Sequence, residues 1–200
     1  RGNVMVCNGK NGAQLIRCDG ATLQNNRIGV DASVSWSMGN HDCGVLISNS
    51  SLCVIGPLNA IGGNGADGLK LSGPSCDQAL IVSNLIGVSA GDALDLGNQG
   101  DGVHLRGGDR NKVIGGNVVA KNYGFGVAIY TGARNTAMGN RIFGNALEAI
   151  HVATNEPGMQ PNAGLRPPSI TNAMSGSARF QGVFSGKTNE PYALEVFYAW

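Results

Sequence analysis

Apolar and polar positions alternate in short triplets along most of the chain, and a small residue precedes each triplet. Gly68-Leu69-Lys70-Leu71 is typical, with a leucine on either side of a lysine. The same arrangement begins at six positions, Gly12, Gly44, Gly68, Gly102, Gly126 and Ala149. Because successive side chains of a strand point to opposite faces, each triplet predicts a short strand with one buried face. No apolar stripe of helical period persists beyond about two turns, which excludes a helical bundle.

Two sets of asparagines recur along the chain together with these triplets. One Asn stands four residues before each triplet, at Asn8, Asn40, Asn64, Asn98, Asn122 and Asn145. In the second set an apolar residue follows two positions later, and its members are Asn3, Asn26, Asn59, Asn84, Asn117 and Asn140. The steps within this second set are 23, 33, 25, 33 and 23 residues. A unit of this size cannot bury its apolar face alone, so the repeat predicts a stack of similar coils.

The asparagines have a physical role in such a stack. Asn tolerates the left-handed backbone of a sharp corner, and its amide both donates and accepts hydrogen bonds. Amides one above another can therefore satisfy each other and the buried backbone of the corner. The pattern predicts an all-β fold, a parallel β-helix (solenoid) of about six coils. Leucine-rich repeats also carry a corner Asn, but the dense leucine scaffold that they need is missing here.

Two repeats are longer than the others, and the extra residues fall at the same place in both. These excursions run over Val30–Asp42 and Val88–Gly100 and align without a gap. One apolar position of the first, Val34, is not kept in the second, where it aligns with Asp92. The repeat predicts two equivalent loops on one flank of the stack.

The repeats resemble those of a known family, the secreted and cell-surface bacterial proteins of the pectate-lyase-like superfamily that are built from right-handed parallel β-helix repeats. Their coils have the form Asn-x-Ile-Gly followed by Gly-Asn-x-x-x-Gly-Val-x-Ile. The corresponding segments here are Asn84-Leu85-Ile86-Gly87 and Gly97-Asn98-Gln99-Gly100-Asp101-Gly102-Val103-His104-Leu105. The resemblance covers residues 1–153 and implies a right-handed helix and a secreted or cell-surface location. It implies no single activity, because this architecture carries lyases, hydrolases, epimerases, tailspikes and adhesins alike.

The composition changes after the last triplet and divides the chain into three parts. Residues 1–153 form the predicted β-helix, and residues 154–168 form a linker with four of the seven prolines. Residues 169–200 are predicted to be a short antiparallel β extension, with alternating strands at Ala178–Phe184 and Tyr192–Tyr198. A small cap over the last open coil is the favoured explanation of this extension, and the start of a β-sandwich is the alternative.

Charge and hydropathy exclude several classes of partner. The formal net charge is +1 and only 14% of residues are charged, so no electrostatic surface for nucleic acid is present. No apolar run approaches the roughly 18 residues of a membrane span, so membrane insertion is not expected. The five cysteines form no Cys-x-x-Cys pair. The coil positions would let Cys53 pair with either Cys18 or Cys76, and the sequence does not decide between them.

If the apolar residues of each triplet face inward, the residues between and after them face outward. This places Lys70, His104, Arg106 and Tyr130 on adjacent coils, with Asp67 and Asp101 at the strand entrances. The resemblance implies that a lyase or epimerase of this fold would use such residues on a uronate polymer, as a base and as a partner of the carboxylate. The favoured explanation is plainer, since any exposed strand face must carry polar residues.

Other residues are candidates for binding rather than catalysis. Trp36, in the first excursion, offers an indole that would stack on a sugar ring, and His104, Arg106, Tyr130 and His151 offer polar and ring contacts on the outward strand face. Asp31, Asp42, Asp92 and Asp95 leave a weak Ca²⁺ site open in the excursions, although solvated loop carboxylates are favoured. The segment Gly63–Gly68 matches a dinucleotide pattern but opens no helix, so no cofactor is predicted.

These observations favour a non-enzymatic extracellular module that acts as a rigid, adhesin-like scaffold. We expect it to contact a polysaccharide or another cell-surface partner, because repeated chemistry at fixed spacing suits a repeating polymer. The alternative is a polysaccharide-acting enzyme, a uronan lyase or epimerase, that uses Lys70, His104, Arg106 and Tyr130.

Overall fold

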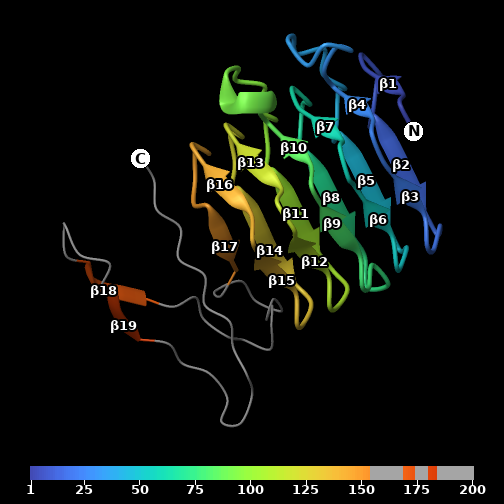
Figure 1. The fold of residues 1–200 in the computed structure, drawn as a ribbon. Helices are drawn as coiled ribbons and strands as arrows, with labels where there is room; N and C mark the ends of the chain where they lie inside the picture. Colours follow the sequence, from blue (N-terminus) through green and yellow to red (C-terminus); the bar gives the residue numbers. More distant parts are fainter. Residues whose placement is uncertain (154–168, 174–179, 184–200) are drawn as a thin grey trace.

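The chain winds into a regular stack of coils with three parallel sheets running along it, as the computed structural model in Figure 1 shows. The structure describes residues 1–153, 169–173 and 180–183. Each coil contributes one short strand to each of sheets A, B and C, except that the described residues of the last coil include strands of sheets A and B alone. All strand pairs within these sheets are parallel, as expected for coils that rise in one direction. The predicted parallel β-helix is therefore confirmed.

The strands are short, and neighbours in a sheet come from successive coils. Sheet A contains β1 (Val4–Met5), β4 (Arg27–Ile28), β7 (Ala60–Ile61), β10 (Leu85–Ile86), β13 (Val118–Ala120) and β16 (Arg141–Phe143). Sheet B contains β2 (Ala13–Ile16), β5 (Val45–Ser48), β8 (Leu69–Ser72), β11 (Val103–Arg106), β14 (Val127–Thr131) and β17 (Ile150–Val152). Sheet C contains β3 (Thr22–Leu23), β6 (Val54–Ile55), β9 (Leu80–Val82), β12 (Lys112–Ile114) and β15 (Thr136–Met138).

The predicted triplets are the strands of sheet B, and they pair in the predicted register. The residues between the apolar positions lie side by side in the order Gln14, Leu46, Lys70, His104, Ala128 and His151. The apolar residues on either side face the interior, and Leu69, Leu71, Val103 and Leu105 have no exposed surface. They pack with the inward residues of the other two sheets in one continuous core along the axis.

Both sets of asparagines form continuous files of hydrogen bonds. In the middle of one file, Asn59 Nδ2 donates to Asn84 Oδ1 at 2.9 Å and Asn84 Nδ2 donates to Asn117 Oδ1 at 3.0 Å. The second file is built in the same way, with Asn64 Nδ2 donating to Asn98 Oδ1 at 2.8 Å. Most amide oxygens also accept the backbone N–H of the preceding Asn, as Asn117 Oδ1 does from Asn84, and most amide nitrogens reach a backbone carbonyl of the coil before, as Asn84 does with the carbonyl of Ile55. The files therefore satisfy buried corner backbone that the strands cannot pair.

The two excursions are equivalent in structure and project from the same edge of the stack, at the top of Figure 1. Loop 1, residues 30–42, closes through an antiparallel bridge between Val30 and Ser37, and loop 2, residues 88–100, closes through the same bridge between Val88 and Asp95. A short 3-10 helix, η1 (Ala90–Asp92), lies within loop 2. The prediction of two equivalent loops on one flank is confirmed.

The mismatch between Val34 and Asp92 has a structural explanation. Both residues have left-handed backbone, with φ of 56° and 61°, so the two loops share this backbone turn although the side chains differ. Val34 packs on the same small apolar cluster as Leu85 of β10, two coils further along. Asp92 instead pairs with Arg141 of β16, again two coils further along. Loop 1 therefore packs through apolar surface at the position where loop 2 forms an ion pair.

The C-terminal part is described only in two strands. β18 (Ser169–Ala173) and β19 (Phe180–Val183) pair in antiparallel fashion, so the predicted antiparallel extension has a described counterpart. β19 falls within the predicted strand Ala178–Phe184, whereas its observed partner precedes it in the chain. The predicted linker, residues 154–168, and the predicted strand Tyr192–Tyr198 lie outside the described residues, and the choice between a cap and the start of a sandwich stays a prediction.

All five cysteines are free thiols, so the disulfide that the sequence left open between Cys53 and either Cys18 or Cys76 is not present. Cys53 Sγ lies 3.4 Å from the carbonyl oxygen of Cys18, and Cys76 Sγ lies 3.6 Å from that of Ile47. The buried thiols therefore contact the backbone of the preceding coil. Burial raises the pKa of the Cys53 thiol, which keeps it protonated. No helix in the described ranges has both the length and the apolar character to cross a membrane.

Replacing Asn84 by alanine tests the role of the files. We expect the free energy of unfolding to fall by about 3 kcal/mol, because three hydrogen bonds are lost and buried partners are left unsatisfied. Asn3→Ala is the matched control, since Asn3 is exposed and its side chain contacts only Asn26 of the same file. It should cost about 1 kcal/mol or less. Urea unfolding of both variants measures the difference, and equal losses would contradict the assigned role.

Candidate functional site

Two aspartates of sheet B stand directly before the glycines that open their strands, and each uses one carboxylate oxygen to hold the next coil. Asp67 Oδ1 accepts the backbone N–H of Asp101 at 2.9 Å, and Asp101 Oδ1 accepts that of Phe125 at 2.9 Å. The Asn side chains at the corners likewise accept backbone N–H groups of a neighbouring coil. The position is therefore structural first, and only the second oxygen of each carboxylate is available for other contacts.

The second carboxylate oxygens meet the cationic and hydroxyl side chains of the neighbouring strands. His104 Nδ1 lies 2.9 Å from Asp101 Oδ2 and 3.4 Å from Asp67 Oδ2. Lys70 Nζ donates to Asp67 Oδ2 at 3.1 Å, and Tyr130 Oη donates to Asp101 Oδ2 at 3.2 Å. We name these five residues the carboxylate cluster. It contains two carboxylates, one lysine and one histidine, so its charges balance when the histidine is protonated.

The pKa values of the cluster follow from this pairing. Burial by itself would raise the pKa of Asp67, but the hydrogen bond and charge of His104, with the N–H of Asp101 and the charge of Lys70, lower it to about 2. Burial by itself would lower the pKa of His104, but its hydrogen bonds to Asp101 and Asp67 raise it. Both shifts favour the charged pair, so the cluster acts as a buried ion-pair network between coils.

Aromatic rings cover the cluster. The ring of Tyr130 stacks on His104 with 4.3 Å between centroids, and the ring of His151 stacks on Phe125 at 4.0 Å. The side chain of His104 is 10% exposed, and its Nε2 atom is buried without a hydrogen-bond partner. The expectation of an exposed histidine on this face is thus wrong, because stacking by the next coil buries it.

The structure brings together some of the predicted site residues and separates others. Lys70, His104 and Tyr130 lie in the cluster, and His151 lies beside Tyr130 with 6.1 Å between ring centroids. Arg106 is exposed, and its strand partner in the next coil is Thr131. The prediction that Arg106 and Tyr130 occupy equivalent outward positions on adjacent coils is wrong, because a bulge between Leu105 and Arg106 shifts the register by one residue.

Asp67, Asp101 and His104 are also the one group of three ligating side chains within the described ranges whose ligand atoms lie close enough to hold a metal ion. However, Lys70 Nζ already lies 3.1 Å from Asp67 Oδ2, and the hydrogen bonds of His104 to Asp101 and Asp67 raise its pKa, which favours its protonated form. An ammonium and an imidazolium compete with a cation for the same oxygens. The chemistry of the group therefore favours ion pairing over metal binding.

The loop aspartates do not gather into the Ca²⁺ site that the sequence left open. The Ser33 hydroxyl donates to Asp31, as do the backbone N–H groups of Trp36 and Ser35, both at 2.7 Å, and these bonds hold the pKa of Asp31 well below its ordinary value. Asp92 pairs with Arg141, and Asp95 accepts the N–H of Gly97 at 3.0 Å. Their carboxylates serve to shape and secure the loops.

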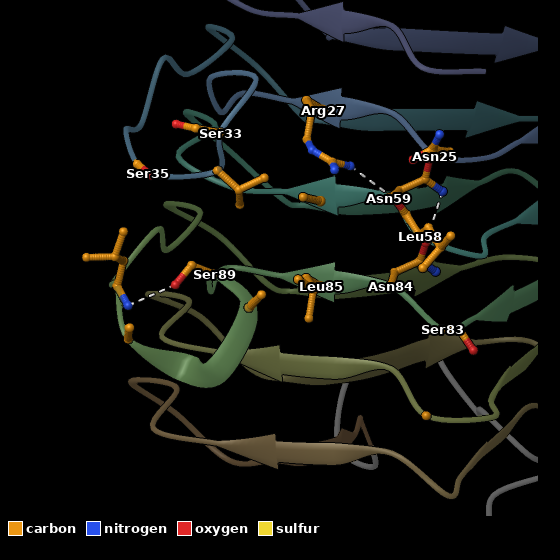
Figure 2. Close-up of a pocket in the computed structure, with 16 residues that line it drawn as sticks. Asn25, Arg27, Ser33, Ser35, Leu58, Asn59, Ser83, Asn84, Leu85 and Ser89 are labelled. Atoms are coloured by element: carbon orange, nitrogen blue, oxygen red, sulfur yellow. Dashed lines mark hydrogen bonds between the residues drawn. The ribbon is translucent and has the colours of Figure 1, made fainter.

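A second region, a groove of about 680 Å³, lies between the two loops on the outer face of sheet A (Figure 2). Its floor is formed by Arg27, Ala60 and Leu85, which are neighbours in the sheet register. The close-up shows loop 1 with Ser33 and Ser35, and loop 2 with Ser89, at one end of these strands, and Asn25, Leu58 and Ser83 at the other end. The wall from loop 2 also includes Ala90, Ala93 and Leu94.

The lining combines an apolar floor with several hydroxyl and amide groups. Serines and asparagines line it beside alanines and leucines, and Arg27 is the only charged residue that lines it among those described. A concave site with apolar walls and a few polar groups is the usual form of a ligand site. Trp36 lies next to Ser35 in loop 1, and its side chain is exposed.

Most of the groove was not predicted from the sequence. The equivalent excursions were a usable signal, because two loops separated by a coil without one must leave a gap between them. The outward column of sheet A, to which Arg27 and Arg141 belong, was a second signal. Neither pattern reveals that Leu58 and Ser83, in the turns before the strands, contribute to the same groove.

Comparison with known proteins gives one match. The sequence model of a protein family described as right handed beta helix region matches residues 11–179. No curated protein matches the chain. No solved structure matches it either.

The carboxylate cluster predicts a pH dependence of stability. Because the folded pKa of His104 is raised, its stabilising contribution is complete below its unfolded value of about 6.5 and is lost as the pH rises through the folded value. Because the folded pKa of Asp67 is lowered, its contribution is complete above its unfolded value of about 3.9 and is lost as the pH falls toward about 2. The urea midpoint of the wild type should therefore decline above about pH 6.5.

His104→Gln should remove most of this alkaline decline, although it lowers stability at neutral pH. His41→Gln is the control, since His41 is exposed and pairs only with its neighbour Asp42 at 3.0 Å. Its urea midpoint should follow the wild-type profile. An unchanged alkaline decline in His104→Gln would show that the cluster does not set the profile.

Proposed function

The chain belongs to the right-handed β-helix family, and on that premise we propose that it is a non-enzymatic extracellular scaffold that holds a polysaccharide in the groove between loops 1 and 2. The groove carries the proposal. It is bounded by two loops that close through equivalent bridges, and its lining joins apolar surface to the serines of the loops and the exposed amide of Asn25. A sugar chain presents the matching surfaces, with apolar ring faces and hydroxyls around the rings. The extracellular location is part of the proposal and rests on the resemblance of the repeats.

The spacing of the loops supports a linear ligand. Loop 1 follows β4 and loop 2 follows β10, with β7 alone between them in sheet A. Strands in a sheet lie about 4.8 Å apart, so the loops leave the stack about 10 Å from each other. Both loops are closed by backbone hydrogen bonds, such as Met38 N to the carbonyl of Gly29 and Leu96 N to that of Gly87. A rigid gap of this width suits one extended chain, because little ordering of the protein is required on binding.

The backbone of loop 1 adds a further argument. A β-branched residue with left-handed backbone is an uncommon and strained arrangement, and Val34 has it at the wall of the groove. Such strain is found chiefly where function requires a fixed loop shape. The hydrogen bonds of Asp31 to the N–H groups of Ser35 and Trp36 hold the loop in this shape.

The uronan lyase or epimerase alternative has one observation in its favour. Lys70, His104 and Tyr130 do gather around two carboxylates, and His104 Nε2 has no hydrogen-bond partner. A catalytic base must reach the proton that it removes, however, and this imidazole is buried between the carboxylates and the ring of Tyr130. The cluster therefore supports a structural role, and the scaffold is the preferred function.

Incubation of the protein with alginate and with polygalacturonate tests this choice. We expect no increase in ultraviolet absorbance from an unsaturated product and no change in the epimer composition of the polymer by NMR. Turnover that disappears in both His104→Gln and Lys70→Met, while both variants stay folded by circular dichroism, would establish the alternative instead.

Filling the groove tests the proposed binding surface. Ala93 of loop 2 lines the groove and is exposed, so Ala93→Trp places a large ring in the gap without disturbing the core. We expect the affinity for the bound polysaccharide to fall about tenfold or more, because the side chain occupies the ligand's place. The measurement is calorimetry with the best ligand from a panel of dextran, xylan, alginate, polygalacturonate and heparin.

Ala146→Trp is the matched control, since Ala146 is exposed and does not line the groove. Its affinity should equal that of the wild type. Equal binding by both tryptophan variants would place the ligand elsewhere, and a panel in which no polysaccharide binds would overturn the proposed function itself.

A further inference from the structure

Arg27 gives the groove an unbalanced positive charge. It lies on the floor, its guanidinium points toward Leu58 and Asn59 in Figure 2, and its side chain is partly buried. No carboxylate of the described residues lies within ion-pair distance of its guanidinium. No acidic residue lines the groove. A cation held in a partly desolvated site without a counter-charge is costly to the folded protein.

The hydrogen bonds of Arg27 do not remove this imbalance. Its Nη1 atom donates to two backbone carbonyls, that of Leu58 at 3.3 Å and that of Asn26 at 3.5 Å, and both distances are long. Its Nε atom is buried and has no partner. A guanidinium has five N–H donors in a fixed fork, so most of its capacity to bind an anion is unused.

The other arginine on this face shows the contrast. Arg141 stands in the same outward column of sheet A as Arg27, four coils further along. It pairs with Asp92 and lies over the ring of Phe143 at 4.5 Å. In loop 1 the position of Asp92 is taken by Val34, which carries no charge. On the outer face of sheet A, Arg141 is therefore neutralised by Asp92 of loop 2, whereas Arg27 keeps its charge for a ligand.

From this we propose that the groove selects an acidic polysaccharide and that the carboxylate of one uronic acid unit pairs with Arg27. This inference rests on the proposed function and adds the charge of the ligand to it. The planar fork of an arginine matches a carboxylate through two parallel hydrogen bonds, which a neutral sugar cannot offer. The serines of the two loops and the apolar floor then contact the rest of the unit. Only one carboxylate is read in each groove, so affinity depends on one pair rather than on the total charge of the polymer.

The test compares Arg27→Met, Arg27→Lys and Lys112→Met in calorimetry with alginate, polygalacturonate, heparin and dextran, in buffer without divalent cations. Lys112 is exposed on sheet C, so its variant removes the same charge away from the groove. We expect both uronans to bind the wild type more tightly than dextran and more weakly as salt is added. Arg27→Met should weaken uronan binding about tenfold or more, and Arg27→Lys should lie between, because it keeps the charge and loses the fork. Lys112→Met should bind as the wild type does.

The outcomes separate this inference from the proposed function. If dextran binds as tightly as the uronans and Ala93→Trp blocks it, the groove is a sugar site but the inference is overturned. Unchanged uronan binding by Arg27→Met and Arg27→Lys also overturns it. Tighter binding of heparin than of either uronan, unchanged in Arg27→Met, would show that affinity follows the total charge of the polymer and contradict the proposal as stated. If no polymer binds the wild type, the proposed function fails together with the inference. Thermal unfolding of each variant shows whether a loss of binding reflects a loss of folded protein.

Discussion

The fold depends on one constraint, which is that polar backbone at the corner of each coil is buried and must be satisfied by the coil above or below. Asn84 shows how completely this is done, since its amide oxygen accepts from Asn59 while its amide nitrogen donates to Asn117 and to the carbonyl of Ile55. Asp67 and Asp101 provide the same service at the entrance of sheet B. Because a coil can satisfy its neighbour only when it lies directly over it, hydrogen bonding fixes the register that the apolar core alone would leave loose.

This constraint also decides which surfaces are open to function. On sheet B, stacking brings Asp67 and Asp101 so close to Lys70 and His104 that the charges of the four side chains offset one another, and the ring of Tyr130 stacks on His104. On sheet A the coil that carries β7 has no loop, and the gap that it leaves is the groove. The polar side chains that the sequence suggested for catalysis, Lys70, His104 and Tyr130, therefore stabilise the stack. The surface best suited to a ligand lies beside the coil that has no excursion.

The sequence predicted the fold and the strand register well, because the files of Asn and the triplets report contacts that are the same in every coil. It failed where a contact is made once. The bulge after Leu105, which separates Arg106 from Tyr130, has no signature in the pattern of apolar residues. The burial of His104 depends on which ring the following coil places over it. The mismatch of Val34 and Asp92 looked like a failed alignment, and only the backbone and the residues two coils away explain it.

The contacts of the two loops with residues two coils further along have a consequence for how such a chain lengthens by duplication. Asn26 and Asn84 are 58 positions apart, as are Asn59 and Asn117, so a pair of coils that bears one loop is repeated in tandem. Each loop contacts a region of the following pair of coils. Val34 of the first loop packs on the same apolar cluster as Leu85, and Asp92 of the second loop pairs with Arg141. A duplicated pair of coils therefore contains its own loop, but one of the residues around that loop belongs to the next pair. Recombination between copies can exchange this neighbouring residue, as Leu85 and Arg141 illustrate, without changing the bridge that closes the loop. Pairs of coils with the same loop can therefore come to differ in charge and still stack on one another.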